Sequence, residues 1–196
     1  LVQSVTGLKI VAVMAELHTC LPRRRRPKAG PLSFGAGGAA ESEEVAIELD
    51  DYASLFLRLD NGARGSFTTC QAAAGRKVDL ALQVFGSKES YAWSHVHPNA
   101  LWIGHREKAN ETFYESSLLQ APETRKYATL PTGHPMGYHD AVFNLFRDYY
   151  AAAAAKRAGK PFEATFPDFR TGHEMMCVVD AAVESDRRGA WVEVGR

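Results

Sequence analysis

Asp51-Tyr-Ala-Ser-Leu-Phe-Leu-Arg-Leu-Asp60-Asn-Gly62 is the stretch that decides the fold of this 196-residue chain. From residue 53 to residue 59 every second position is Ala or Leu, and polar or aromatic residues stand between them. This period of two is typical of a strand with one buried face. Asn61-Gly62 favours a type I′ hairpin turn, after which residues 63–72 return as the partner strand. The stretch therefore predicts an antiparallel hairpin.

Further strands are predicted on both sides of this hairpin. The Ile- and Val-rich residues 8–18 precede it, after a short amphipathic helix end that Gly7 caps. Alternation resumes at residues 78–84, and shorter strands follow at residues 91–94, 101–105 and 112–115. Strands joined in succession by short turns are typical of an antiparallel meander. Because the chain lacks an initiator Met and starts inside a helical pattern, we expect it to be part of a longer protein.

Helical spacing takes over in the last third of the chain. An apolar stripe begins after Tyr138 and runs toward Gly159. Its members are Val142, Leu145, Phe146, Tyr149 and Tyr150. A second helix is predicted from a Thr171-x-x-Glu174 capping box to Gly189, and residues 191–194 close the chain as a strand. The sequence thus predicts an α+β fold, with a largely antiparallel, open-faced β-sheet and helices packed on one face, in a single domain over residues 1–196.

Composition excludes several classes of protein. The 23 basic and 23 acidic residues balance, so no nucleic acid is expected as a partner. No apolar run approaches the ~18 residues of a membrane helix, so no membrane association is expected. The three cysteines stand far apart without a Cys-x-x-Cys spacing, which favours a reducing compartment and a cytoplasmic location.

Residues 22–49 are predicted to form a flexible loop. They contain the run Arg23–Arg26, three prolines and a glycine-rich segment, followed by acidic residues that compensate the arginines. Gly35-x-Gly37-x-x-Ala40 matches the dinucleotide-binding fingerprint, but neither the strand nor the helix that the fingerprint needs flanks it. We therefore predict no cofactor-binding residues in this chain.

Histidines suggest two further sites. His95, His97 and His105 could imitate a zinc triad, but no suitably spaced carboxylate or Cys completes it, so no metal site is predicted. The loop from Pro131 to Asp140 contains two glycines and two prolines directly before a helix. A tight loop in that position can present His134 and Tyr138 to a ligand.

Several stretches, in order along the whole chain except residues 23–49, resemble the C-terminal domain of the glucose–fructose oxidoreductase / inositol dehydrogenase family, written Gfo/Idh/MocA. They are Leu1–Gly7, Asp50–Ala53, Leu57–Gly65, Gln71–Arg76, Val84–Lys88 with Trp93, Pro98–Leu101, Gly133–Pro135, Gly137-Tyr138, Asn144, Phe166-Pro167, Gly172, Ala182, Ser185 and Trp191–Val194. Many relatives have Glu in the Gly-His-Pro loop where this chain has Met136, a departure that would alter substrate polarity.

The resemblance implies the C-terminal half of an NAD(P)-dependent oxidoreductase acting on a sugar, inositol or related polyol. In that family an N-terminal Rossmann domain binds NAD or NADP, and the C-terminal domain supplies much of the substrate pocket and the oligomerisation sheet. The Rossmann half, the Glu-Lys-Pro lysine and the His-x-x-x-Asp motif of the family have no counterpart here. The chain alone is therefore expected to be inactive, to contain no catalytic residue and to bind no cofactor.

Three side chains are predicted to line the substrate side of the sheet: Arg76, His134 and Tyr138. The alternative makes Arg76 a surface residue and His134 a residue that stabilises its own loop. A homodimer or higher oligomer is expected through the open face of the sheet, where Phe56 and Arg58 point. The rival to an enzyme is a non-catalytic binding or scaffolding module that keeps the sheet without a nucleotide-binding domain.

Overall fold

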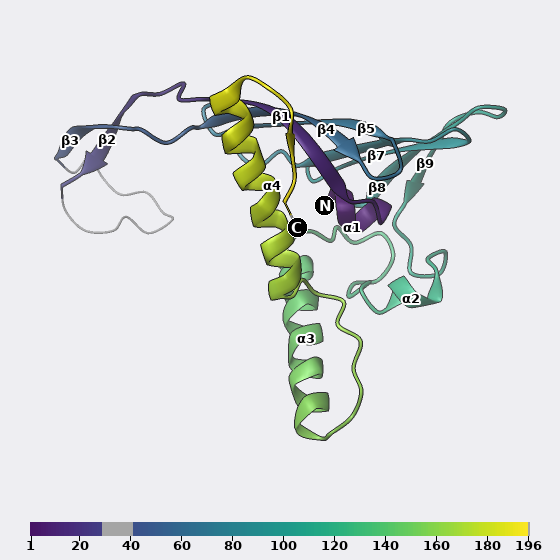
Figure 1. Ribbon diagram of the computed structural model, residues 1–196. Coiled ribbons are helices and arrows are strands. Elements are labelled where there is room, and N and C mark those ends of the chain that lie inside the picture. Colours follow the sequence, from purple (N-terminus) through teal and green to yellow (C-terminus); the bar gives the residue numbers. More distant parts are fainter. Residues whose placement is uncertain (29–40, 196) are drawn as a thin grey trace. The chain divides into compact units, whose positions relative to one another are not determined.

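A computed structural model describes residues 1–28 and 41–195 (Figure 1). The chain divides into two compact units. We call Val2–Gly75 together with the chain from Gly172 onward the core unit, and Arg76–Thr171, with which Leu1 is grouped, the inserted unit. Each unit has an antiparallel sheet of its own, and the predicted α+β class is confirmed.

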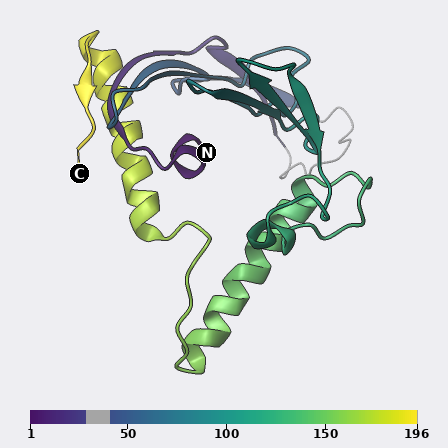
Figure 2. The same ribbon diagram turned by 90° about the vertical axis from the view of Figure 1, so that its right-hand side faces the viewer.

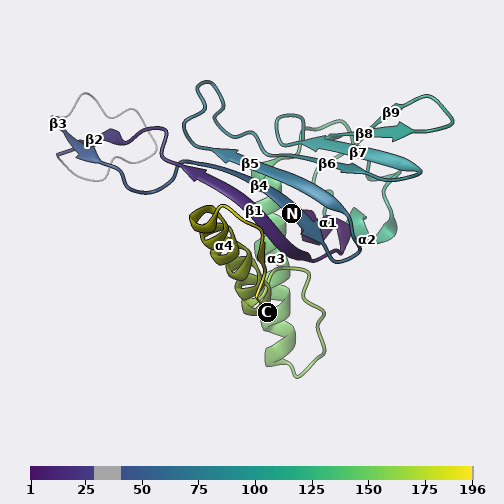
Figure 3. The same ribbon diagram turned by 45° about the horizontal axis from the view of Figure 1, so that its top comes forward.

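The sheet of the core unit has the strand order β10-β1-β4-β5, all antiparallel. Figure 3 shows β1, β4 and β5 of this sheet. These strands are Val192–Glu193, Ile10–His18, Tyr52–Leu59 and Arg64–Cys70. The predicted alternation in β4 is confirmed, because Ala53, Leu55, Leu57 and Leu59 are buried while Phe56 is 61% exposed. The buried face packs against Ala181 and Ala182 of helix α4, Phe169–Arg188. The apolar core of this unit therefore lies between one sheet face and one helix.

The end of α4 also completes the hydrogen bonding of β1. After α4 the chain reverses direction and forms β10 (Figure 2). This short strand pairs with Ala12 and Val13 of β1. Beyond that point the amide of Ala15 donates to Ser185 Oγ at 2.9 Å, and the amide of Leu17 donates to Asp186 Oδ1 at 2.8 Å. Through these two hydrogen bonds the polar side chains of α4 fix the helix to the sheet.

The turn between β4 and β5 differs from the prediction. A type I′ turn needs a positive φ at both central residues, but within the described residues only glycines have positive φ, among them Gly62 at 89°. The amide of Gly62 donates to Leu59 O at 3.0 Å, and Asn61 Oδ1 accepts from the amide of Ala63 at 2.9 Å. The type I′ prediction was wrong because the Asn61 side chain stabilises a longer turn with a single left-handed residue.

Two short strands lie in the described parts of the predicted loop, residues 22–28 and 41–49. Helix α1, Val2–Thr6, ends at Gly7 as expected, but after β1 the chain forms a second hairpin from β2, Arg23–Pro27, and β3, Ser42–Ala46. Arg26 stands directly opposite Glu43 and pairs with it, and Arg23 Nε lies 2.7 Å from Glu44 Oε1. Opposite charges across a strand pair stabilise it. The fingerprint-like segment from Gly35 to Ala40 lies outside the described residues.

The inserted unit contains the predicted meander in the order β6-β7-β8-β9. Its strands are Ala81–Phe85, Glu89–Ser94, Ala100–His105 and Glu111–Tyr114, followed by α2, Pro122–Arg125, and α3, Tyr138–Arg157. The strand predicted from residue 78 thus begins at Ala81 and belongs to a different sheet from β5.

Two helix predictions need correction. The apolar stripe of α3 was expected to be buried, but Leu145, Phe146, Tyr149 and Tyr150 are exposed, and the buried residue of this helix is Asp148. Helix α4 begins before the predicted capping box: Asp168 Oδ1 accepts from the amide of Thr171 at 2.8 Å, which makes Asp168 the capping residue. Asp168, three residues before Thr171, supplies the cap in its place.

Candidate functional site

Asn99 connects the loop at residues 131–137 to the strands of the inserted unit. Its Nδ2 donates to His134 O and its Oδ1 accepts from the amide of Met136, both at 3.0 Å. Its own carbonyl accepts from the amide of Glu115, just after β9, at 2.7 Å. Because a side-chain amide offers a donor and an acceptor side by side, one residue satisfies two backbone groups of the loop. The loop therefore has a defined position beside the ends of β8 and β9.

A cavity of about 290 Å³ lies beside this loop. It is lined by His97, Pro98, Asn99, Ala100, Tyr114, Glu115, Gly133 and Pro135. This volume is at the lower end of small-molecule sites, about 300–1,000 Å³. Most of the accessible lining is apolar, and only a few polar groups reach it.

Glu115 is one of the polar residues of this lining. Its Oε1 lies 3.4 Å from Gln120 Nε2, whereas its Oε2 is buried and has no hydrogen-bond partner in the described part of the chain. Leaving a buried acceptor unpaired is costly. This oxygen has almost no accessible surface, so it belongs to the packed side of Glu115 and not to the part that lines the cavity.

The ring of His134 is hydrogen-bonded to the backbone of its own loop. Its Nδ1 lies 3.0 Å from Pro131 O, and because a carbonyl only accepts, Nδ1 carries the hydrogen. In the neutral ring Nε2 is then an acceptor, and the side chain is exposed. Pro131 thus orients the ring while Nε2 stays available to a ligand, and the substrate-binding role of His134 stays a prediction.

None of the three predicted residues lines the cavity, although Gly133 and Pro135, on either side of His134, do. Tyr138 is the first residue of α3, and its side chain is 67% exposed, with its ring 6.0 Å from that of His139. Arg76 forms an ion pair with Asp79, and its side chain is 70% exposed. Within the described ranges, no hydrogen bond or ion pair joins Arg76 to His134 or Tyr138. Their roles in substrate binding are also still predictions.

The three histidines considered for zinc do not come together. His95 packs its ring edge-on against Trp93, with centroids 6.4 Å apart, and His97 lines the cavity. Both lie in a turn after β7 rather than in the extended stretch that the spacing predicted. In the part of the chain that the structure covers, no group of three or more His, Cys, Asp or Glu side chains could hold a metal ion.

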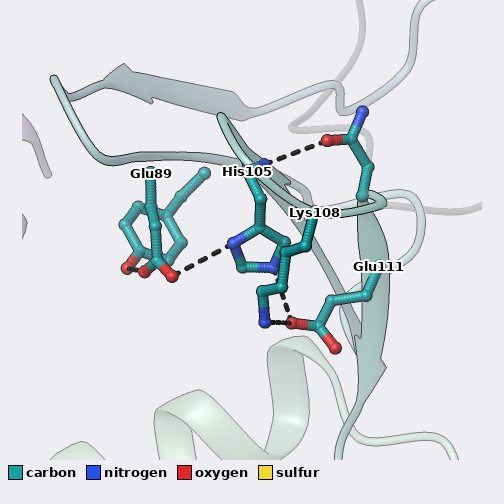
Figure 4. Close-up of polar contacts among 6 residues, drawn as sticks. Glu89, His105, Lys108 and Glu111 are labelled. Atoms are coloured by element: carbon teal, nitrogen blue, oxygen red, sulfur yellow. Dashed lines mark hydrogen bonds and ion pairs between the residues drawn. The ribbon is translucent and has the colours of Figure 1, made fainter.

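His105 is instead enclosed by two carboxylates (Figure 4). Its side chain is 5% exposed, with Nδ1 3.1 Å from Glu89 Oε1 and Nε2 2.6 Å from Glu111 Oε1. Because a carboxylate only accepts, Nε2 donates the hydrogen bond to Glu111. The hydrogen bond from His105, together with Lys108, lowers the pKa of Glu111. This cluster joins β7, β8 and β9 and leaves no ring nitrogen for a ligand.

Two aspartates anchor the helix that follows the loop. Asp140 accepts from Thr129 Oγ1 at 2.7 Å and from the amide of Gly137 at 2.9 Å, and these bonds lower its pKa. The buried Asp148 accepts from Thr165 Oγ1 at 2.5 Å and from the hydroxyl of Tyr127 at 2.9 Å. These hydroxyls, with the adjacent Arg147, lower the pKa of Asp148 to about 2.

Sequence reasoning missed Asn99 and Glu115. Asn99 stood within one of the stretches that carry the family resemblance, Pro98–Leu101, but nothing in its spacing assigned it a role. Glu115 was placed at the end of a short strand. The contacts of Asn99 with His134 and Met136 span 35 and 37 residues of sequence, so no local pattern could have indicated them.

The described part of the chain contains no helix with the length and apolar character needed to cross a bilayer. Residues 1–92 match the family model of the GFO/IDH/MocA C-terminal domain. The chain is 25% identical over 197 residues to levoglucosan dehydrogenase from Pseudarthrobacter phenanthrenivorans, a match covering 93% of this chain and 46% of that protein.

Solved structures agree with this assignment. An oxidoreductase from Sinorhizobium meliloti matches with a TM-score of 0.77 and 26% identity, covering 96% of this chain and 47% of that one. A levoglucosan dehydrogenase in complex with NADH and levoglucosan has the same fold, with a TM-score of 0.74 and 22% identity over 96% of this chain and 46% of that one.

The fold and these matches define a domain of the kind found in oxidoreductases. The predicted resemblance to the C-terminal domain of the Gfo/Idh/MocA family is confirmed. The chain spans less than half the length of the relatives described above.

Proposed function

We propose that this chain is the substrate-binding and oligomerisation domain of an NAD(P)-dependent oxidoreductase that acts on a sugar, inositol or related polyol. The observation that carries the proposal is the similarity to levoglucosan dehydrogenase across 93% of the chain. NAD or NADP would be held by an N-terminal Rossmann domain outside these residues, where it accepts hydride from an alcohol carbon. The residues of this chain would bind and orient the polyol.

The loop and cavity of the inserted unit suit that role. The Nε2 of His134 can accept a hydrogen bond from a substrate hydroxyl. Tyr138 and Arg76 add exposed donors elsewhere in the same unit. Hydrogen bonds of this kind give specificity, because a ligand without the matching hydroxyl leaves a buried polar group unpaired.

The open face of the core sheet supports self-association. Phe56 projects from the face opposite α4, and Met14 stands directly beside it on β1 and is also exposed. Adjacent exposed apolar side chains on a sheet favour a protein partner. We therefore expect a homodimer or higher oligomer through this face. Light scattering that gives a 21.5 kDa monomer over a wide concentration range would count against it.

The test of the enzymatic role uses the protein encoded by the complete reading frame. It should reduce NAD or NADP in the presence of one or more polyols or sugars, measured by nicotinamide absorbance. His134→Ala should remove a polar contact with the substrate worth on the order of 1–3 kcal/mol. That loss corresponds to roughly a tenfold or greater drop in kcat/KM.

His139→Ala is the matched control, since His139 is also exposed and lies only five residues away. Unchanged kinetics in folded His134→Ala would remove His134 from the substrate site. Absence of turnover with every polyol would favour the non-catalytic scaffolding module.

The proposal that the cofactor binds outside these residues is tested with residues 1–196 alone, for which titration calorimetry should detect no binding of NAD or NADP. Saturable micromolar binding would overturn the assignment of the cofactor to another domain.

A further inference from the structure

We infer that Asn99 is a positioning residue, which holds the loop at residues 131–137 so that His134 is presented in one orientation beside the cavity. Its effect on substrate binding rests on the proposed function of His134. Its effect on the loop itself depends only on the contacts within the inserted unit.

Asn99 is the connection between this loop and the strands. In the described part of the chain, residues 133–136 have two kinds of hydrogen bond: bonds of His134 to Pro131 within the loop, and the two bonds to Asn99. The contacts of Thr132 with Ser116 and Ser117 are 3.4 Å long, at the weak end of hydrogen bonding. The position of His134 relative to the strands therefore depends chiefly on one side-chain amide.

The backbone of Asn99 is itself fixed from both sides. Trp93 Nε1 donates to Pro98 O at 3.0 Å, and the amide of Glu115 donates to Asn99 O at 2.7 Å. The amide of Ala100 also closes a turn onto His97 O at 3.1 Å. A side chain that starts from a fixed backbone loses little additional freedom when it binds the loop, which makes it an effective support for a binding residue.

Both ends of the Asn99 amide are needed because the loop offers one acceptor and one donor. His134 O accepts from Nδ2, and the Met136 amide donates to Oδ1. Asp has the same shape but no donor, so Asn99→Asp keeps the bond to Met136 and places a negative oxygen against the His134 carbonyl. Leu has a similar volume and makes neither bond. The two variants thus remove one or both contacts without leaving a large cavity.

The experiment uses the complete protein and two readouts. Hydrogen exchange followed by mass spectrometry should show amides 133–137 exchanging roughly tenfold faster or more in Asn99→Leu, with a smaller increase in Asn99→Asp. Asn110→Ala is the control, because Asn110 Oδ1 also accepts a backbone amide, that of His105, at 3.0 Å. This control should leave exchange in the loop unchanged.

The kinetic readout separates positioning from general damage. In Asn99→Leu the KM for the polyol should rise about tenfold, while kcat and the KM for NAD(P) change little. In the double variant Asn99→Leu/His134→Ala, little further loss should appear beyond His134→Ala alone, because both changes remove the same contact.

Three results would overturn the inference. Unchanged loop exchange in both Asn99 variants would show that other contacts hold the loop. Faster exchange with unchanged KM would show that the loop does not position a substrate-binding group. Additive losses in the double variant would show that Asn99 acts apart from His134. The proposed substrate-binding role of His134 has its own test: it fails if the single variant His134→Ala has the same kinetics as the wild type. If Asn99→Leu does not fold, the same outcomes are read from Asn99→Asp.

Discussion

The two units of this chain are stabilised by different interactions. In the described part of the chain, all buried apolar side chains lie in the core unit, in β1, β4 and α4. The buried side chains of the inserted unit are polar, namely Ser116 and Asp148, and His105 is enclosed by carboxylates. The core unit thus depends on apolar packing, which is non-directional, whereas the inserted unit depends on directional hydrogen bonds.

The difference has a functional consequence. Hydrogen bonds fix the direction of each group, so the inserted unit can hold a loop such as residues 131–137 in one arrangement. Their net contribution to stability is modest, and the unit leaves apolar side chains of α3 exposed. We therefore expect the core unit to contribute most of the stability and the inserted unit to fix the arrangement of the candidate site.

The largest effect on stability is expected from a substitution in the apolar core of the core unit. Leu57 is 4% exposed and packs between the sheet and α4. Leu57→Ala should lower the free energy of unfolding by about 2–5 kcal/mol, because it removes buried methyl groups and leaves a cavity. Chemical denaturation measures the loss. Phe56→Ala, at the neighbouring position on the exposed face, should change the stability by less than about 1 kcal/mol.

Equal losses for the two substitutions would contradict the assignment of the faces of β4. That result would mean that the face of Phe56 is also buried in solution, as it would be inside an oligomer. Repeating the denaturation at several protein concentrations distinguishes the two explanations, since oligomer stability depends on concentration.

The next largest effect is expected from a substitution that removes hydrogen bonds within the inserted unit. Asp148 accepts hydrogen bonds from Thr165 and Tyr127 and pairs with Arg147, which ties α3 to segments on both sides of it. Asp148→Ala should leave those donors unpaired and increase hydrogen exchange in residues 126–148 on the order of tenfold. The exchange of β1 and β4 should not change. Glu107→Ala, at an exposed position in the same unit, serves as the control.

Exchange that increases equally in both units would show that the two unfold together. In that case the contrast between them would describe only their packing and not their separate stability.

A smaller effect concerns the pH dependence of the stability of the inserted unit. Hydrogen bonds from Thr165 and Tyr127, with Arg147, lower the pKa of Asp148 from the usual 3.8 to about 2. A group whose pKa is lower in the folded state stabilises the fold above its usual pKa, and that contribution is lost as the pH falls. The inserted unit should therefore lose stability between about pH 4 and pH 2.

Thermal melts of the wild type and Asp148→Asn across this range measure the effect. Asn cannot ionise, so the variant should lack this part of the pH dependence, while all other carboxylates titrate in both proteins and cancel in the difference. Parallel pH profiles of the two proteins would show that ionisation of Asp148 does not cause the loss of stability at low pH.

Local pattern predicted the core unit well and the site poorly, for a physical reason. The alternation from residue 53 to residue 59 reflects burial on one face of one strand, and each residue reports it directly. The hairpin of β2 and β3 depends on which Arg stands opposite which Glu, a register that composition does not contain. Glycine and proline content identified the loop of His134, but its contacts with Asn99 connect positions 35 and 37 residues apart.

The smallest expected effect concerns the apolar stripe of α3, where local pattern predicted burial and the structure shows exposure. Phe146 is 54% exposed, and its ring stacks on Tyr150 with centroids 6.4 Å apart. Because little of its surface is buried and one ring contact contributes about 0.5–1.5 kcal/mol, Phe146→Ala should cost about 1 kcal/mol at most, far less than Leu57→Ala. Chemical denaturation of residues 1–196 measures both. A loss above about 2 kcal/mol that grows with protein concentration would show that a second copy covers this helix in solution. The inserted unit would then also depend on apolar packing, supplied from outside the chain, and the contrast with the core unit would hold only for the isolated molecule.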